Sequence, residues 1–195
     1  MSRGLRALGW LGVLALGGFS IFGRELPQSR AGESLTRRLW GPFAGLAAQA
    51  QWVRVHGAML ADREDLVFQR SETAFDLDPG ATEGWLFLAR HLFYDRASQA
   101  READPVRRAA WMRAAVAVAE RGQATAREPG DLALWLGLAR VRMATDEHLA
   151  WPDGDAGRRD LLLLAAEDFT RAAQAGDPDG AELAGSARRL AQALP

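Results

Sequence analysis

The stretch PGATEGWLFLAR, residues 79–90, decides the fold, because its skeleton returns 50 residues later as PGDLALWLGLAR, residues 129–140. Each copy follows an acidic residue, carries a tryptophan six positions after the proline, and ends in Leu-Ala-Arg. A weaker third copy begins at Asp177-Pro178 and has Ala184 where the others have tryptophan. Recurrence over three copies predicts a repeat array, in which each unit buries its apolar face against its neighbours.

Each copy is typical of a helix end, a proline turn and the start of a new helix. Proline ends the preceding helix and disfavours helical geometry in the residue before it, so the break falls at the acid–proline step. Thr82 and Asp131 are the expected caps of the new helices. The predicted repeat core occupies one face of these helices and consists of Trp85, Leu88, Ala89, Trp135, Leu138 and Ala139.

This skeleton resembles the tetratricopeptide repeat family over roughly residues 40–195. Trp85, Leu88 and Ala89 match the first-helix pattern of that family, and Ala117, Ala124 and Pro129 match its closing pattern; the matches of the next unit are Trp135, Leu138, Ala139, Ala166, Ala173 and Pro178. The period of 50 residues departs from the family value of about 34. Ser71, Arg121 and Thr170 stand where the family has an aromatic residue. The resemblance implies an all-α fold of stacked helix-turn-helix units that form a short solenoid.

Composition excludes several classes of function. The net charge of -1, from 24 basic and 25 acidic residues, argues against nucleic-acid binding through bulk charge. The absence of cysteine excludes disulfides, thiol catalysis and thiolate metal sites. Hydrophobic residues make up 48% of the chain, which is enough apolar material for a core.

An uncharged run, residues 7–23, lies near the amino terminus between Arg6 and Arg24. As a helix it rises about 26 Å, against about 30 Å for the hydrocarbon core of a bilayer. We expect a transmembrane anchor with the amino terminus inside and the repeats outside, in a periplasmic location. The alternatives are a cleaved signal peptide and a soluble helix. The predicted organisation is therefore an anchor over 1–24, a linker over 25–34 and a repeat domain over 35–195, with Trp40 near the membrane interface.

Helical spacing of apolar residues predicts a first helix bent at Gly41-Pro42, and a later helix that begins at Pro105 with Asp104 as its cap. The last helix has no partner after it and is expected to close the array. The expected helices span 35–62, 63–77, 82–98, 105–126, 131–146, 156–175 and 179–193.

Candidates for chemistry are few. His56, His91 and His148 lie in separate predicted segments, without the spacing of a helical metal pair. The stretches 153–155 and 177–180 begin like calcium loops but lack the remaining ligands, and turn formation explains both. We therefore expect no enzyme activity, cofactor, metal or small-molecule substrate.

Arginine recurs at one place of the repeat, at positions 90, 140 and 189. The family resemblance puts this place on the concave side of the array. Guanidinium groups beside apolar side chains suit a peptide that carries acidic side chains or a free carboxylate. The alternative is that the arginines pair with nearby acidic residues on a solvated face. The predicted groove consists of Arg90, Arg140, Arg189, Leu86, Phe93, Tyr94, Leu136 and Met143.

These features predict a membrane-anchored scaffold for protein–protein interaction, or a non-catalytic subunit of a membrane complex, that binds a protein or peptide through the concave surface. The alternative is a structural subunit that is held in a membrane complex through its transmembrane helix, with the repeats as a rigid external cover.

Overall fold

The computed structural model describes residues 35–149 and 154–194, and within these ranges it contains helices and no strand. The all-α fold class is therefore confirmed for this part of the chain. The predicted anchor, 1–24, and linker, 25–34, lie outside the described residues. The elements are α2 (Leu35–Trp40), the 3-10 helix η1 (Gly41–Phe43), α3 (Ala44–Leu60), α4 (Glu64–Leu77), α5 (Thr82–Arg90), the π-helical segment η2 (His91–Arg96), α6 (Pro105–Gln123), α7 (Pro129–Thr145), α8 (Gly154–Gln174) and α9 (Gly180–Ala193).

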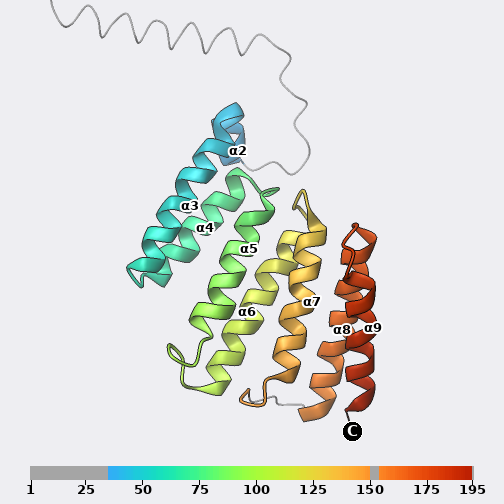
Figure 1. Cartoon of the computed structure of the whole chain (residues 1–195). Helices are drawn as coiled ribbons and strands as arrows, with labels where there is room; N and C mark the ends of the chain where they lie inside the picture. The colour runs from blue at the N-terminus through green and yellow to red at the C-terminus, as the bar shows by residue number, and fades with distance from the viewer. Residues whose placement is uncertain (1–34, 150–153, 195) are drawn as a thin grey trace, which may run out of the picture.

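The helices lie side by side in a row that follows the chain, with α3 at one edge and α9 at the other (Figure 1). α3 packs on α4, the helix made of α5 and η2 packs on α6, and α7 packs on α8. Contacts of α7 with α5 and α6 join successive pairs, and α9 packs on α8. None of the described helices is both long enough and apolar enough to cross a membrane.

Most helix ends follow their sequence signals. Gly41 has a φ of 48° and begins η1, so the expected bend before α3 is present. The Asp104 side chain caps α6 as predicted, because its Oδ1 accepts a hydrogen bond from the backbone N–H of Val106 at 2.9 Å. Pro129 is the first residue of α7, a position where its missing N–H has no intrahelical partner to lose.

Two predicted caps are wrong. Thr82 is already the first residue of α5, and its Oγ1 accepts a hydrogen bond from the backbone N–H of Glu128 at 3.1 Å instead of capping its own helix. Asp131 lies inside α7, because Pro129 starts that helix two residues earlier. The hydroxyl of Thr82 thus joins the first acid–proline turn to the second.

Further contacts hold the acid–proline turns together. Arg127 donates from Nη2 to Asp78 Oδ1 at 2.6 Å and from its backbone N–H to the Gly80 carbonyl at 3.0 Å. A Cβ built on Gly130 would lie 2.6 Å from Ala175 Cβ, so the second turn meets the third at close range. The repeated sequence therefore produces turns that touch one another along one side of the row.

The main core is organised around aromatic rings. Trp85 stacks on Phe75 with ring centroids 3.5 Å apart, and its Nε1 donates to the Pro79 carbonyl at 2.8 Å. Gly122 of α6 makes room for this indole, because a Cβ there would lie 2.6 Å from the Trp85 ring. Aromatic pairs in such geometries add to the stabilisation from burial alone.

The predicted repeat core is buried with one exception. Leu138 is 46% exposed, because α7 turns its other sides toward α5, α6 and α8 and leaves this side chain outside those contacts. Leu138 is therefore not a core residue. The buried members are Trp85, Leu88, Ala89, Trp135 and Ala139.

Candidate functional site

A pocket of about 360 Å³ lies between α3 and the helix made of α5 and η2. α3 contributes its C-terminal residues, α5 and η2 contribute the opposite wall, and the loop before α6 contributes one arginine. We call this pocket the α3–α5 groove. Its lining residues are His56, Met59, Leu60, Phe87, His91, Asp95 and Arg101.

The apolar wall of the groove depends on the close approach of α3 and α5. Trp52 of α3 meets Phe87 of α5 edge to face, with ring centroids 5.8 Å apart. Gly84 permits this approach, because a Cβ there would lie 2.5 Å from the Trp52 ring. Leu60 is 77% exposed and Phe87 is 37% exposed, so apolar surface remains open on both sides of the groove.

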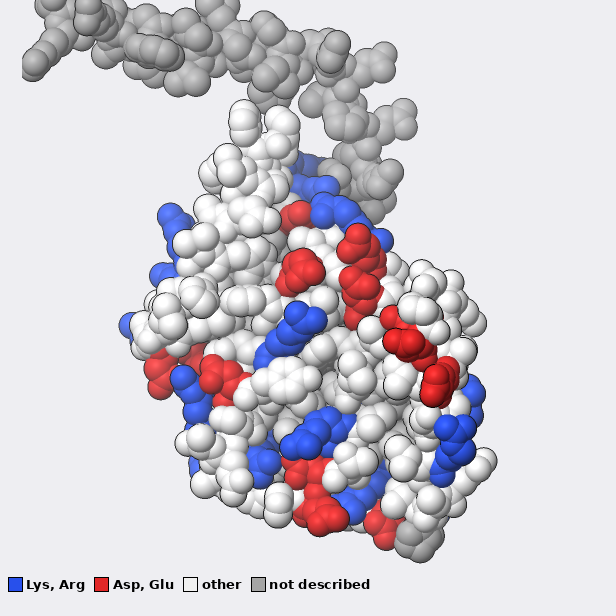
Figure 2. Space-filling view, viewed as in Figure 1, with Lys and Arg blue, Asp and Glu red and all other residues white. Residues whose placement is uncertain are grey.

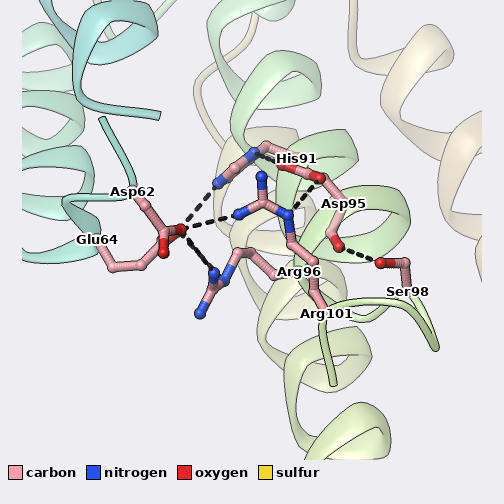
Figure 3. Close-up of polar contacts among 7 residues, drawn as sticks. All are labelled: Asp62, Glu64, His91, Asp95, Arg96, Ser98 and Arg101. Carbon is pink, nitrogen blue, oxygen red and sulfur yellow. Dashed lines mark hydrogen bonds and ion pairs between the residues drawn. The ribbon is translucent and has the colours of Figure 1, made fainter. Parts of the chain in front are cut away.

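The polar wall is centred on His91 of η2, which lies between two carboxylates (Figure 3). Its Nδ1 is 3.0 Å from Asp95 Oδ2, and its Nε2 is 3.5 Å from Glu64 Oε1. The imidazole is almost fully buried, and each ring nitrogen faces a carboxylate. The ring therefore joins η2 to the start of α4.

Next to this wall, two arginines meet Asp62, which lies in the turn between α3 and α4 (Figure 3). Asp62 Oδ1 accepts hydrogen bonds from Arg96 Nη1 at 3.1 Å and from Arg101 Nη1 at 2.8 Å. Arg96 Nε also lies 3.2 Å from Glu64 Oε1, and Arg101 Nε lies 3.2 Å from Asp95 Oδ1. We call Asp62, Glu64, His91, Asp95, Arg96 and Arg101 the ion cluster.

The ion cluster fixes one end of the groove. Asp62 has a φ of 53°, a left-handed conformation that Asp adopts more readily than most residues, and this sharp turn brings the start of α4 against η2. η2 is π-helical, a wider winding that is frequent at functional sites. Neither buried oxygen of Glu64 has a partner with hydrogen-bond geometry among the described residues, and Oε1 forms ion pairs at 3.2 and 3.5 Å with Arg96 and His91.

The side chains that line the groove offer apolar surface, imidazole, carboxylate and guanidinium groups. Among the residues that line it, none carries a hydroxyl or thiol nucleophile. No group of three or more potential metal ligands occurs in the described part of the chain. What the groove offers is exposed apolar surface beside fixed charges, which is the composition of a site for a side chain or a peptide segment.

The outer side of α5 and η2 borders the groove and carries two of the predicted site residues. Arg90 is exposed and has no ion pair among residues 35–149 and 154–194. Tyr94 is 57% exposed, one helical turn further along. Helical spacing places Phe87, Arg90 and Tyr94 on one side of this helix. Arg90, which has no ion pair among the described residues, therefore lies on the same side of this helix as two partly exposed aromatic side chains.

Arg140 occupies the same position in the repeated motif as Arg90, but its side chain lies in the interior. It is 5% exposed, and its guanidinium donates to Asp168 of α8 and to Glu120 of α6. Arg171 also donates to Asp168. Burial raises the pKa of Asp168 above its ordinary value, and the charges of Arg140 and Arg171 oppose this shift. Arg140 therefore belongs to a structural ion pair and does not form part of an exposed row of arginines.

The remaining predicted groove residues also divide. Arg189 is exposed on α9 and donates from Nη2 to the Ser186 hydroxyl at 2.9 Å, so it lies on the far edge of the row from Arg90. The other four predicted groove residues, which are apolar, lie in the main core. Neighbouring helices cover the helix face that the tetratricopeptide resemblance predicts to be open. These four are Leu86, Phe93, Leu136 and Met143.

The residues that sequence reasoning missed lie around the α3–α4 turn, in η2 and in the loop before α6, which holds Arg101. Asp62 and Glu64 flank the α3–α4 turn, whereas His91 and Asp95 lie one helical turn apart in η2. The spacing of His91 and Asp95 was a detectable signal of pairing. The approach of Glu64 was not detectable, because it depends on how the first hairpin packs on the second.

Comparisons of the chain with protein-family models, with curated proteins and with solved structures find no match.

Proposed function

We propose that the chain is a non-catalytic interaction subunit of a membrane-associated assembly, and that it binds a segment of a partner protein along the α3–α5 groove. The observation that carries the proposal is the unpaired, exposed Arg90 beside Phe87 and Tyr94, at the border of a groove with open apolar walls. In this proposal the three sequence copies form tetratricopeptide-like units, and residues 7–23 hold the chain at the membrane.

The proposed ligand follows from the groove's chemistry. Leu60 and Phe87 offer apolar contact, which contributes most of the free energy of association in buried patches. The guanidinium of Arg90 can donate two parallel hydrogen bonds to a carboxylate. Exclusion of water by the nearby aromatic side chains strengthens such an ion pair. The expected partner segment therefore carries a large apolar side chain next to Asp, Glu or a free carboxyl terminus.

Site-specific photo-crosslinking tests this proposal. A photoreactive phenylalanine analogue replaces Phe87 or Tyr94 in the full-length chain, expressed in its own cells. Phe68 of α4 is the matched control, because it has the same 37% exposure as Phe87 but lies outside the groove. We expect one discrete adduct from positions 87 and 94, absent at position 68 and lost when Arg90→Ala is added.

Equal adduct patterns at positions 68 and 87 would contradict the groove as the binding site. An adduct that survives Arg90→Ala would show that the carboxylate contact is not needed. If the partner instead crosslinks only to residues 7–23, the structural-cover alternative accounts for the chain better.

A further inference from the structure

A row of large apolar side chains runs along the outside of α2, η1 and α3. Leu39, Leu46, Val53 and Leu60 follow one another at intervals of seven residues, and each is more than 70% exposed. Leu35, Trp40 and Phe43 extend this exposed surface over α2 and η1. We call it the outer apolar face. It appears in Figure 2 as the white area over the α2–α3 end of the molecule.

α3 is apolar on two opposite sides. One side buries Ala44, Ala48, Val55 and Ala58 against α4. At 100° per residue, the row of Leu46, Val53 and Leu60 lies on the side opposite to those buried residues. A helix that is hydrophobic all round is normally covered on all sides. The outer side of α3 is covered by no other described helix.

The charges of this segment are of one sign. Between Leu35 and Leu60 the sequence contains Arg37, Arg38 and Arg54 and no Asp or Glu. Arg38 and Arg54 are exposed. An apolar face bordered by arginines, with Trp and Phe among its members, has the composition of a helix that lies in the interface of a membrane with anionic lipids.

The position of the segment along the chain points to the same surface. Eleven residues, 24–34, separate the uncharged run 7–23 from the start of α2. Eleven extended residues span at most about 36 to 40 Å, so α2 starts close to whatever holds that run. If the run is inserted in a bilayer, the outer apolar face is the first folded surface that meets it.

We infer that the outer apolar face lies against the bilayer, with Leu46 and Val53 among the acyl chains near the headgroups and Arg38 and Arg54 beside anionic headgroups. This inference rests on the part of the proposed function that holds the chain at a membrane. In this inference α2 and α3 also bind the membrane. Their contact with the bilayer fixes the orientation of the row of helices and leaves the α3–α5 groove at the membrane surface.

A second copy of the chain fits the outer apolar face less well than a bilayer does. Two copies of the outer apolar face would bring arginines together with no acidic residue in the same segment to balance them. A helix of a partner membrane protein is a different occupant, which the following experiment separates from lipid.

The natural absence of cysteine permits single-cysteine labelling of the full-length chain. Leu46→Cys and Val53→Cys report on the outer apolar face, and Gln192→Cys, exposed on α9, is the matched control. Each variant carries an environment-sensitive fluorophore and is reconstituted in phosphatidylcholine vesicles with phosphatidylglycerol. A quencher attached to the lipid acyl chains then measures contact with the bilayer, and flotation measures whether the chain is bound to the vesicles.

We expect the label at positions 46 and 53 to emit at shorter wavelength and to be quenched about twofold more than the label at 192, because only the outer apolar face enters the interface. A chain that floats while all three labels remain equally in water would overturn the inference and leave the membrane part of the proposed function standing. A chain that does not float would overturn both.

Two further outcomes identify other occupants. A shift at position 53 that grows with protein concentration and is insensitive to the lipid quencher would assign the face to a second copy. Protection that appears only after the crosslinked partner is added would assign it to that protein. Either result overturns contact with lipid.

Discussion

The two edges of the row of helices present opposite kinds of surface. α9 buries Ala184, Ala187 and Ala191 and turns polar residues outward, among them Glu182 and Arg189. α3 buries one apolar side and exposes another. A row of stacked helices needs a polar outer side at each end to remain soluble on its own. The α9 edge meets this need within the chain, whereas the α3 edge calls for something outside the described helices to cover it.

Glycines in different helices of the row also differ in what surrounds them. Gly137 of α7 packs against Phe169 of α8, where an added Cβ would lie 2.5 Å from the ring. Gly45 and Gly57 of α3 have no atom within 4 Å of an added Cβ. Glycine is therefore a packing requirement where α7 meets α8, whereas on α3 it lies on an open face.

Arg140→Ala is expected to lower the free energy of unfolding by about 3 kcal/mol, because it breaks a buried ion pair and leaves Asp168 with Arg171 alone. Arg90→Ala, at the equivalent sequence position, is expected to change it by less than about 0.5 kcal/mol. Urea unfolding of the full-length variants, followed by circular dichroism, measures both. Equal losses of unfolding free energy in the two variants would show that Arg90 and Arg140 have the same environment.

Gly137→Ala is expected to destabilise the chain by about 1–3 kcal/mol, since the Phe169 ring must move to admit a methyl group. The same substitution at Gly57 has open space and removes a flexible residue from a helix. Gly57→Ala is therefore expected to stabilise by about 0.5–1 kcal/mol. Thermal unfolding gives both values, and a loss of stability in Gly57→Ala would mean that the outer side of α3 is covered within the chain.

Replacing Leu46 and Val53 by Gln is expected to change the free energy of unfolding by less than about 0.5 kcal/mol per residue, because both side chains are already in water in the described structure. The measurement is denaturation in detergent beside the unsubstituted chain. A loss of several kcal/mol would indicate that these residues belong to a core and not to a docking face.

The smallest expected effect concerns pH. Because the pKa of Asp168 is raised in the folded chain, folding favours its protonated form, and its contribution to stability falls as pH rises from about 3.9, the ordinary aspartate value, through the raised pKa. Asp168→Asn removes this titration. Unfolding midpoints at several pH values should show the unsubstituted chain losing stability relative to the variant as pH rises; parallel curves would contradict the shift.

Local signals in the sequence were enough for most of the helix ends. Proline steps, the Asp104 cap and the bend at Gly41 act through their own backbone and near neighbours, so their effects can be derived without a tertiary structure. Thr82 is the instructive failure, because its hydroxyl accepts from Glu128, 46 residues away. A cap can be predicted from sequence only where no distant group competes for the side chain.

The candidate site was less predictable for the same physical reason. Arg90 and Arg140 share the triplet Leu-Ala-Arg, yet one is in solvent and the other meets carboxylates from α6 and α8. Which sides of a helix are covered depends on crossing geometry, which the spacing of apolar residues leaves open. The exposed row on α3 illustrates this, since its sequence alone has the pattern of a core helix.

The central claim is that the α3 edge is covered in the membrane and the α9 edge is not. The most direct test measures the rate at which a water-soluble maleimide labels Val53→Cys and Gln192→Cys in open membrane fragments, relative to the same variants after denaturation. The account predicts strong protection of position 53 and none at position 192, two sites that are both exposed in the structure. Equal labelling of the two sites in membranes would contradict it.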